Sequence, residues 1–184
     1  MPFGCARWFS HINGVNPPPA LRPWLTDRTS LTQKLIAQCG QFRVQTLRQE
    51  NTSSLADEYR AVGLARRTRV QTREVLLRCD EEPVVFAHTI MPPSASTADW
   101  PVFGTLGQRA LGTTLFGDPR VLRGELEYAR LRPQHPLARR ARAAIRAERM
   151  DSPVYARRCL FRRKNGLLLV TELFLPPIAM LGPE

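Results

Sequence analysis

Several segments of the chain have the hydrophobic pattern of a β-strand, either by alternation with polar residues, as in 41–47 and 121–131, or by apolar residues on both faces, as in 167–175. Such segments occur at residues 41–47, 67–79, 84–91, 121–131, 154–163 and 167–175. The last two are joined by Lys164-Asn165-Gly166, and Asn-Gly is the favoured pair in a tight hairpin turn. A second turn cluster at residues 80–83 predicts a hairpin between the segments at 67–79 and 84–91. Successive hairpins predict a mainly antiparallel sheet.

Helical patterns are fewer. Ser30 and Gln33 have the spacing of a capping box, and the apolar positions that follow predict a helix from about Leu31 to Cys39. Residues 103–117 form a helix-like stretch with several glycines, and the arginine-rich residues 133–151 predict a basic helix. The polar residues 51–64 predict a loop with a helical turn. Together these patterns predict one α+β domain over residues 24–184, preceded by a Pro-rich arm at residues 1–23 that is either laid over the domain or loose.

The charge of the chain indicates what kind of molecule the protein binds. The 184 residues include 27 Lys and Arg against 16 Asp and Glu, a formal charge of +11. Most of these cations are arginines, which suit planar, bidentate recognition of carboxylate or phosphate. An anionic partner is therefore expected, and nucleic acid, an anionic lipid surface and a small polyacid all fit. No apolar run has the length of a membrane span or the form of a signal peptide, so we expect a cytoplasmic protein.

Other chemistry-bearing residues are scattered. The four cysteines lie far apart in the sequence, at Cys5, Cys39, Cys79 and Cys159, and we expect free thiols in a reducing compartment. The histidines are dispersed as well, so no metal site is expected, and His88 is interpreted as a hydrogen-bonded histidine of the core or sheet. The basic run at residues 139–149 lacks interleaved aromatic residues, which favours a solvated helix face over a nucleic-acid reader.

Two charged residues conflict with the strand patterns around them. Glu172 lies within an apolar strand whose two faces both look buried, on the same face as Leu168 and Val170. Arg73 shares a face with Val75, Leu77 and Cys79. A buried charge needs a partner. The pair either holds the sheet together as an internal ion pair, or it faces a cavity, where Arg73 clamps a ligand carboxylate and Glu172 transfers protons.

A second arginine pair occupies the strand at residues 154–163. Arg157 and Arg158 are adjacent, so their side chains point to opposite faces and at most one of them points inward. A solvated face is the expected environment for this pair.

Several segments, in this order, resemble the bacterial chorismate pyruvate-lyase family. They are WLTDRTSLTQKL (24–35), REVLL with the Pro83 turn (73–83), LGQRALGTTLF (106–116), ARRC (156–159) and LLLVTELFLP (167–176). The resemblance covers about residues 24–176, and TELFLP and LG-x-x-x-LG are its most specific parts. It implies a lyase that converts chorismate to 4-hydroxybenzoate and pyruvate, the entry step of ubiquinone synthesis. It also implies no cofactor or metal, and a small antiparallel sheet with flanking helices that encloses the ligand beneath two flaps.

The resemblance also implies four ligand contacts. The carboxylate-binding arginine of the family corresponds to Arg73, and its essential glutamate corresponds to Glu172. Its two backbone contacts correspond to Leu31 and Leu111. Two positions depart from the family pattern, since His88 stands where an arginine is expected and Cys159 where a serine is expected.

Two other classes of function are considered. Effector domains of some transcriptional regulators have a related fold and bind small carboxylates without catalysis. The second alternative, a basic protein that binds nucleic acid, is supported by the net charge alone. The resemblance favours the lyase, with chorismate as its small-molecule substrate, no nucleic-acid partner and a monomeric state. Stable membrane insertion is not expected, whereas a transient contact with a membrane surface is left open.

Overall fold

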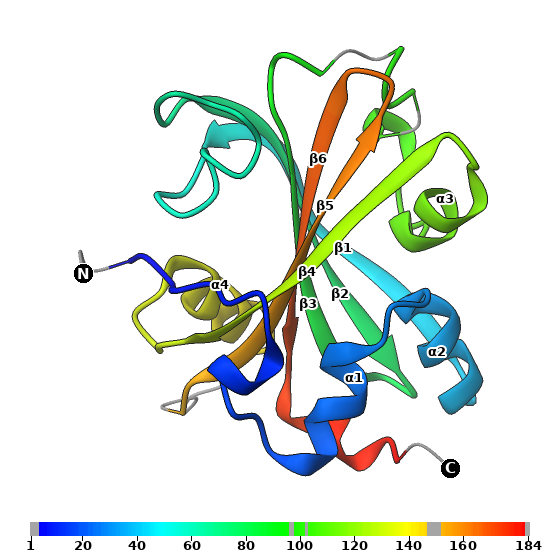
Figure 1. The fold of residues 1–184 in the computed structure, drawn as a ribbon. Helices are drawn as coiled ribbons and strands as arrows, with labels where there is room; N and C mark the ends of the chain where they lie inside the picture. Colours follow the sequence, from blue (N-terminus) through cyan, green and yellow to red (C-terminus); the bar gives the residue numbers. More distant parts are fainter. Residues whose placement is uncertain (1–3, 96–97, 102, 147–151, 183–184) are drawn as a thin grey trace.

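A computed structural model describes residues 4–95, 98–101, 103–146 and 152–182. Its centre is a six-stranded antiparallel sheet in the order β1-β2-β3-β6-β5-β4 (Figure 1). The strands are β1 Phe42–Ser53, β2 Arg69–Cys79, β3 Glu82–Met91, β4 Val121–Leu131, β5 Val154–Arg163 and β6 Gly166–Phe174. The predicted α+β class and the antiparallel hairpins are confirmed.

Helices cover both faces of this sheet. Figure 1 shows α1, α2 and α3 on one side and α4 on the other. Their bounds are α1 Arg22–Thr26, α2 Leu31–Gln38, α3 Leu111–Gly117 and α4 Pro136–Ala144, with short 3-10 helices at Ile12–Gly14, Pro19–Leu21, Phe103–Thr105 and Pro176–Met180. The cover on both faces explains why the central strands are apolar at nearly every position.

The alternation of side chains divides the core between the two faces. On β2, Val75 and Leu77 pack in the cluster beneath α1, α2 and α3, whereas Leu76 packs in the cluster beneath α4. The N-terminal residues join the first cluster through Ile12 and Leu21. Phe9 also pairs with Tyr128 of β4. The described part of the 1–23 segment is therefore laid over the domain.

Three element boundaries differ from the sequence prediction. Residues 51–53, predicted as loop, continue β1, because an edge strand paired only with β2 tolerates polar residues. The helix-like stretch at 103–117 is α-helical only over Leu111–Gly117, and within the described part of 133–151, which ends at residue 146, the basic helix covers Pro136–Ala144. Arg149, at the end of the predicted basic run, lies outside the described residues.

The expectation of four free thiols is wrong for one pair. Cys39, at the end of α2, and Cys79, at the end of β2, form a disulfide with their Cα atoms 5.3 Å apart. Their separation of 40 residues gave no sign that these two ends meet. Cys5 and Cys159 are free.

Candidate functional site

A narrow cavity lies between the sheet and helices α2 and α3. Its lining comes from all six strands and both helices. Most of the lining is apolar, and its charged members are Arg73, Arg123, Arg157 and Glu172. A mainly apolar pocket with a few convergent charged groups is the usual form of a small-molecule site.

Two cross-strand rows of residues form the floor of the cavity. In the first row, Arg73 of β2 is followed on β3, β6 and β5 by Thr89, Val170 and Cys159. In the second row, the residues on the same strands are Val75, Ala87, Glu172 and Arg157. All eight residues line the cavity. The faces predicted for Arg73 and Glu172 are therefore correct, and the two residues share one cavity.

Arg73 is buried, with 2% of its surface exposed, and it has no acidic partner among the described residues. Its Nη2 donates to the backbone oxygens of Gly107 and Arg109, at 2.9 and 3.0 Å. Its Nε is buried without a hydrogen-bond partner. Burial lowers the pKa of this guanidinium, because a charge loses hydration there. A buried arginine that has an unpaired N–H group and no negatively charged partner is well suited to bind an anionic ligand.

Glu172 is paired, although not with Arg73. Its Oε2 accepts from Nε of Arg157 at 2.6 Å, across the β5–β6 register. Arg157 is 2% exposed, and its Nη1 donates to the backbone oxygens of Trp24, Leu25 and Asp27. The ion pair between Arg73 and Glu172, one of the two alternatives considered from the sequence, is therefore wrong.

The expectation that Arg157 and Arg158 lie on a solvated face is also wrong. Arg157 lies in the cavity wall, and Arg158 is 8% exposed on the other face of the sheet. There Arg158 donates to Glu127 at 2.7 Å and to the backbone oxygen of Asp57 at 2.7 Å, and it stacks over Trp8. Other elements cover both faces of β5. The side chains of Arg157 and Arg158 point in opposite directions, and both are therefore buried.

Leu31 and Leu111 are the first residues of the two helices that border the cavity. Amides of the first helical turn have no partner within their helix and carry partial positive charge, so they suit an anionic group. The predicted cap is present before Leu31, where Oγ of Ser30 accepts from the Gln33 amide at 3.4 Å. The helices touch at Gly112, where an added Cβ would lie 2.6 Å from Oγ1 of Thr32.

The two departures from the family pattern have different surroundings. Cys159 lines the cavity, and burial raises the pKa of its thiol, so it is neutral there. His88 lies on the opposite face from its cavity-lining neighbours Ala87 and Thr89. It is held between Glu74 at 2.8 Å and Glu58 at 3.0 Å, which confirms a buried, partnered histidine.

Sequence reasoning missed Arg123. This β4 residue lines the cavity and lies over the rings of Phe116 and Phe161. Its position opposite Phe161 in the register was not readable from the sequence, because a bulge between Arg123 and Leu126 shifts the alternation of β4.

The described residues hold neither a group of three His, Cys, Asp or Glu side chains that could bind a metal ion nor a helix long and apolar enough to span a membrane. The cavity instead gathers arginines, an ion-paired carboxylate and two helix N-termini. Such an arrangement around a mainly apolar cavity is typical of domains that bind a small organic acid.

Comparison with known proteins identifies the family. The model of the chorismate lyase family matches residues 5–180, so the chain belongs to the chorismate lyase family. A probable chorismate pyruvate-lyase of Cupriavidus metallidurans is 45% identical over 94% of this chain and 81% of its own. One from Methylobacillus flagellatus is 42% identical over 95% of this chain and 96% of its own.

The fold occurs more widely. The crystal structure of the PhnF C-terminal domain superimposes with a TM-score of 0.54 over 81% of this chain and 92% of that one, at 15% identity. The effector domain of PhnF from Mycobacterium smegmatis gives a TM-score of 0.52 over 80% and 89%, also at 15% identity. Such low identity shows a shared fold alone.

Proposed function

We propose that this protein converts chorismate to 4-hydroxybenzoate and pyruvate, as the first committed step of ubiquinone biosynthesis in the cytoplasm. We further propose that it acts as a monomer and needs no cofactor. The observation that carries the proposal is the buried Arg73, whose Nε has no partner, in one cavity with Glu172. Membership of the chorismate lyase family supports the choice of substrate.

Arg73 binds the ring carboxylate in this proposal. A guanidinium can hold a carboxylate through two parallel hydrogen bonds, which fix the orientation of the ring as well as its position. The amides of Leu31 and Leu111 add donors at the edge of the site. Holding the ring in one orientation converts the elimination into a positioned, unimolecular step.

Glu172 moves the proton. Aromatisation requires loss of the proton from the ring carbon that bears the hydroxyl, and cleavage of the bond from the neighbouring carbon to the ether oxygen. The departing enolpyruvate then takes up a proton on its methylene carbon and becomes pyruvate. The second oxygen of Glu172 has no partner among the described residues, which leaves it open for proton transfer. Arg157 holds the first oxygen and keeps the carboxylate in place.

Entry of the substrate requires movement. The cavity has a volume of about 60 Å³, whereas pockets for small molecules usually measure about 300–1,000 Å³. We propose that α2 and the segment at residues 103–117 act as the two flaps and move outward to admit chorismate. The backbone oxygens of Gly107 and Arg109 tie the second flap to Arg73.

The proposal is tested by incubating the purified protein with chorismate in EDTA. Pyruvate is followed with lactate dehydrogenase and NADH, and 4-hydroxybenzoate is measured by chromatography. Equimolar formation of both products is expected. If no pyruvate forms, or if it forms only after a metal is added, the proposed reaction is wrong. Size-exclusion chromatography with light scattering checks the monomeric state.

One alternative is favoured by the shared fold with the PhnF effector domain. In that case the protein binds 4-hydroxybenzoate or a related acid without turnover. Tight binding of 4-hydroxybenzoate in calorimetry, together with no loss of chorismate over hours, would support this binding role.

A further inference from the structure

The cavity contains more positive charge than the proposed contacts use. Its described lining has three arginines and one carboxylate, Glu172. Glu172 is paired with Arg157, so these two charges offset each other. Arg73 and Arg123 remain without a carboxylate partner in the cavity. A mainly apolar cavity with two positive charges that form no ion pair, one of them fully buried, fits a dianion better than a monoanion.

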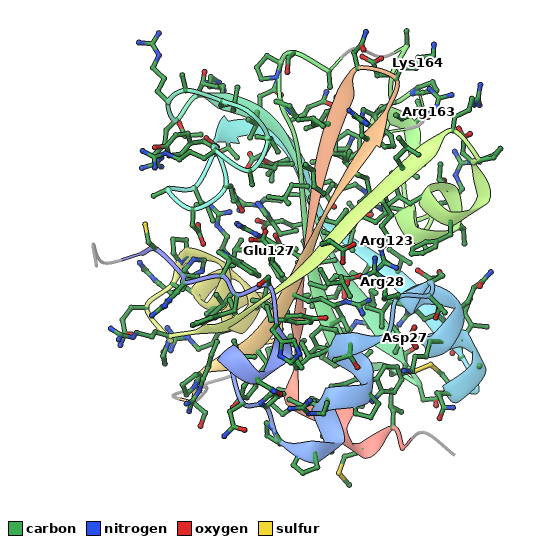
Figure 2. All side chains as sticks on the ribbon, in the orientation of Figure 1. Asp27, Arg28, Arg123, Glu127, Arg163 and Lys164 are labelled. Carbon is green, nitrogen blue, oxygen red and sulfur yellow. A yellow bond between two sulfur atoms is a disulfide. The ribbon has the colours of Figure 1, made fainter. Side chains whose placement is uncertain are left out.

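Arg123 is fixed in position but not neutralised. Its guanidinium carbon lies 5.0 Å from the ring centre of Phe116 and 6.0 Å from that of Phe161. One of its terminal nitrogens donates to the backbone oxygen of Arg28. The nearby Glu125 is exposed and forms its ion pair with Arg28, and its attraction to Arg123 is the weaker of the two. Figure 2 labels Arg123 and Arg28 beside each other, between β4 and α2.

The open donor of Arg123 is the second observation. Its Nε is buried and has no hydrogen-bond partner by distance and angle, as is the case for Nε of Arg73. The guanidinium also interacts with the Cys159 thiol, but burial raises the pKa of this thiol, so it is neutral and does not offset the charge. An unpaired donor of a charged group is costly in a protein interior, and a carboxylate is its best partner. The same unusual feature therefore occurs twice in one cavity, once for each uncompensated arginine.

The two arginines lie on either side of Glu172 and Arg157 in the strand order. Arg73 is on β2 and Arg123 on β4, with β3, β6 and β5 between them. At about 4.8 Å per strand, their backbones are about 19 Å apart across the sheet. Both long side chains reach into the intervening cavity, where Glu172 and Arg157 occupy the middle strands. This order of groups matches a molecule with an acid at each end and its reacting bonds in between.

We propose that Arg123 binds the second carboxylate of the substrate, the one on the enolpyruvyl group. This inference rests on the proposed function, because chorismate is the dianion concerned. When the ether bond breaks, one carboxylate stays with each product, so Arg73 keeps the aromatic acid and Arg123 keeps the pyruvate. Arg123 therefore determines specificity for substrate over product, which has only the ring carboxylate.

The test uses two stable ligands that differ by one carboxylate. These are 3-(carboxymethoxy)-4-hydroxybenzoate, a dianion with its second acid on the carbon that carries the ether in chorismate, and 4-hydroxy-3-methoxybenzoate, which lacks the second acid. Calorimetry on the wild-type protein should show about tenfold or tighter binding of the dianion, as expected for a charge-assisted hydrogen bond. Arg123→Met should abolish this preference and lower kcat/KM for chorismate by a similar factor. Binding of 4-hydroxybenzoate should change by less than about threefold.

Two further variants serve as controls for the effect of Arg123→Met. Arg120→Met removes a nearby arginine whose side chain is 66% exposed and paired with Asp118, and it should leave all three affinities unchanged. Arg123→Lys keeps the charge but not the planar fork, so it should retain part of the preference for the dianion. Retained binding of 4-hydroxybenzoate shows that each variant is folded.

The outcomes separate this inference from the proposed reaction. Pyruvate release by the wild type, with an equal affinity for the two ligands or an unchanged preference in Arg123→Met, overturns the role of Arg123. Equal affinity of the wild type for the two ligands overturns the inference without any variant, and if Arg123→Met does not fold, a reduced preference in Arg123→Lys assigns the second carboxylate to Arg123, whereas an unchanged one overturns the assignment. Absence of pyruvate overturns the proposed reaction, while a preference that Arg123→Met abolishes still assigns the second carboxylate site to Arg123.

Discussion

Replacing Glu172 with glutamine separates its chemical role from its structural one. The amide has nearly the same shape, and its oxygen can still accept from Nε of Arg157, which lies 2.6 Å from the carboxylate in the native protein. It cannot accept a proton as a carboxylate does. If Glu172 is the acid–base group, kcat should fall by at least about 10²-fold. Binding of 4-hydroxybenzoate should survive, since Arg73 is untouched.

The structure also sets the expected loss of stability. Arg157 keeps its hydrogen bonds to the backbone oxygens of Trp24, Leu25 and Asp27, and only the charge of its carboxylate partner is removed. The cost is therefore that of weakening one charged hydrogen bond, about 1–3 kcal/mol. For a chain of this size that lowers Tm by about 2–12 °C.

Three measurements on Glu172→Gln test the reasoning: calorimetric binding of 4-hydroxybenzoate, Tm, and kcat from pyruvate release. Arg157→Met serves as the comparison, because it leaves a carboxylate and three backbone oxygens without their donor and should cost more, about 3–5 kcal/mol. A Gln variant that is as stable and as active as the wild type would refute both roles. Lost stability with unchanged kcat would leave Glu172 as an ion-pair partner only.

Three further changes probe the anchor, the buried histidine and the helix contact. Arg73→Ala removes the carboxylate anchor, so calorimetry should show affinity for 4-hydroxybenzoate lowered at least about 30-fold, and near-normal binding would contradict that role. Burial alone lowers the pKa of His88, but its two neighbouring glutamates outweigh this effect and raise the pKa to about 9. The stability from this charge is thus present below about pH 6.5 and is lost as pH rises through about 9, so the Tm deficit of His88→Gln should be large at pH 6 and small at pH 10. Gly112→Ala should cost about 1–3 kcal/mol in denaturant unfolding, because its Cβ meets Thr32, whereas Gly117→Ala, with open space around it, should not.

Much of the fold followed from local pattern. The strand at 154–163, its Asn-Gly turn and the strand at 167–175 are found within one or two residues of their predicted ends. The inward directions of Arg73 and Glu172 were predictable for the same reason, because a period of two fixes which neighbours share a face. A charged residue on an otherwise apolar face then marks a cavity or an ion pair.

What the sequence left undetermined depends on contacts between distant segments. Arg157 and Arg158 looked solvated because adjacent strand residues cannot share a face, yet both faces of β5 are covered. The apolar residues at both parities of that strand were the available signal. The disulfide between Cys39 and Cys79 depends on where the end of α2 packs, which no local pattern records.

The order of the strands has a consequence for folding. The sheet consists of two three-stranded meanders, β1–β3 and β4–β6, and among the described strands they are joined by the β3–β6 pairing. Arg73 belongs to the first meander, whereas Glu172 and Arg123 belong to the second. Neither meander alone contains a complete site, so an intermediate with only one of them formed cannot bind the substrate. In the proposed binding mode, a dianion contacts both meanders, and at 100 times its Kd it stabilises their joined state by about 2.7 kcal/mol.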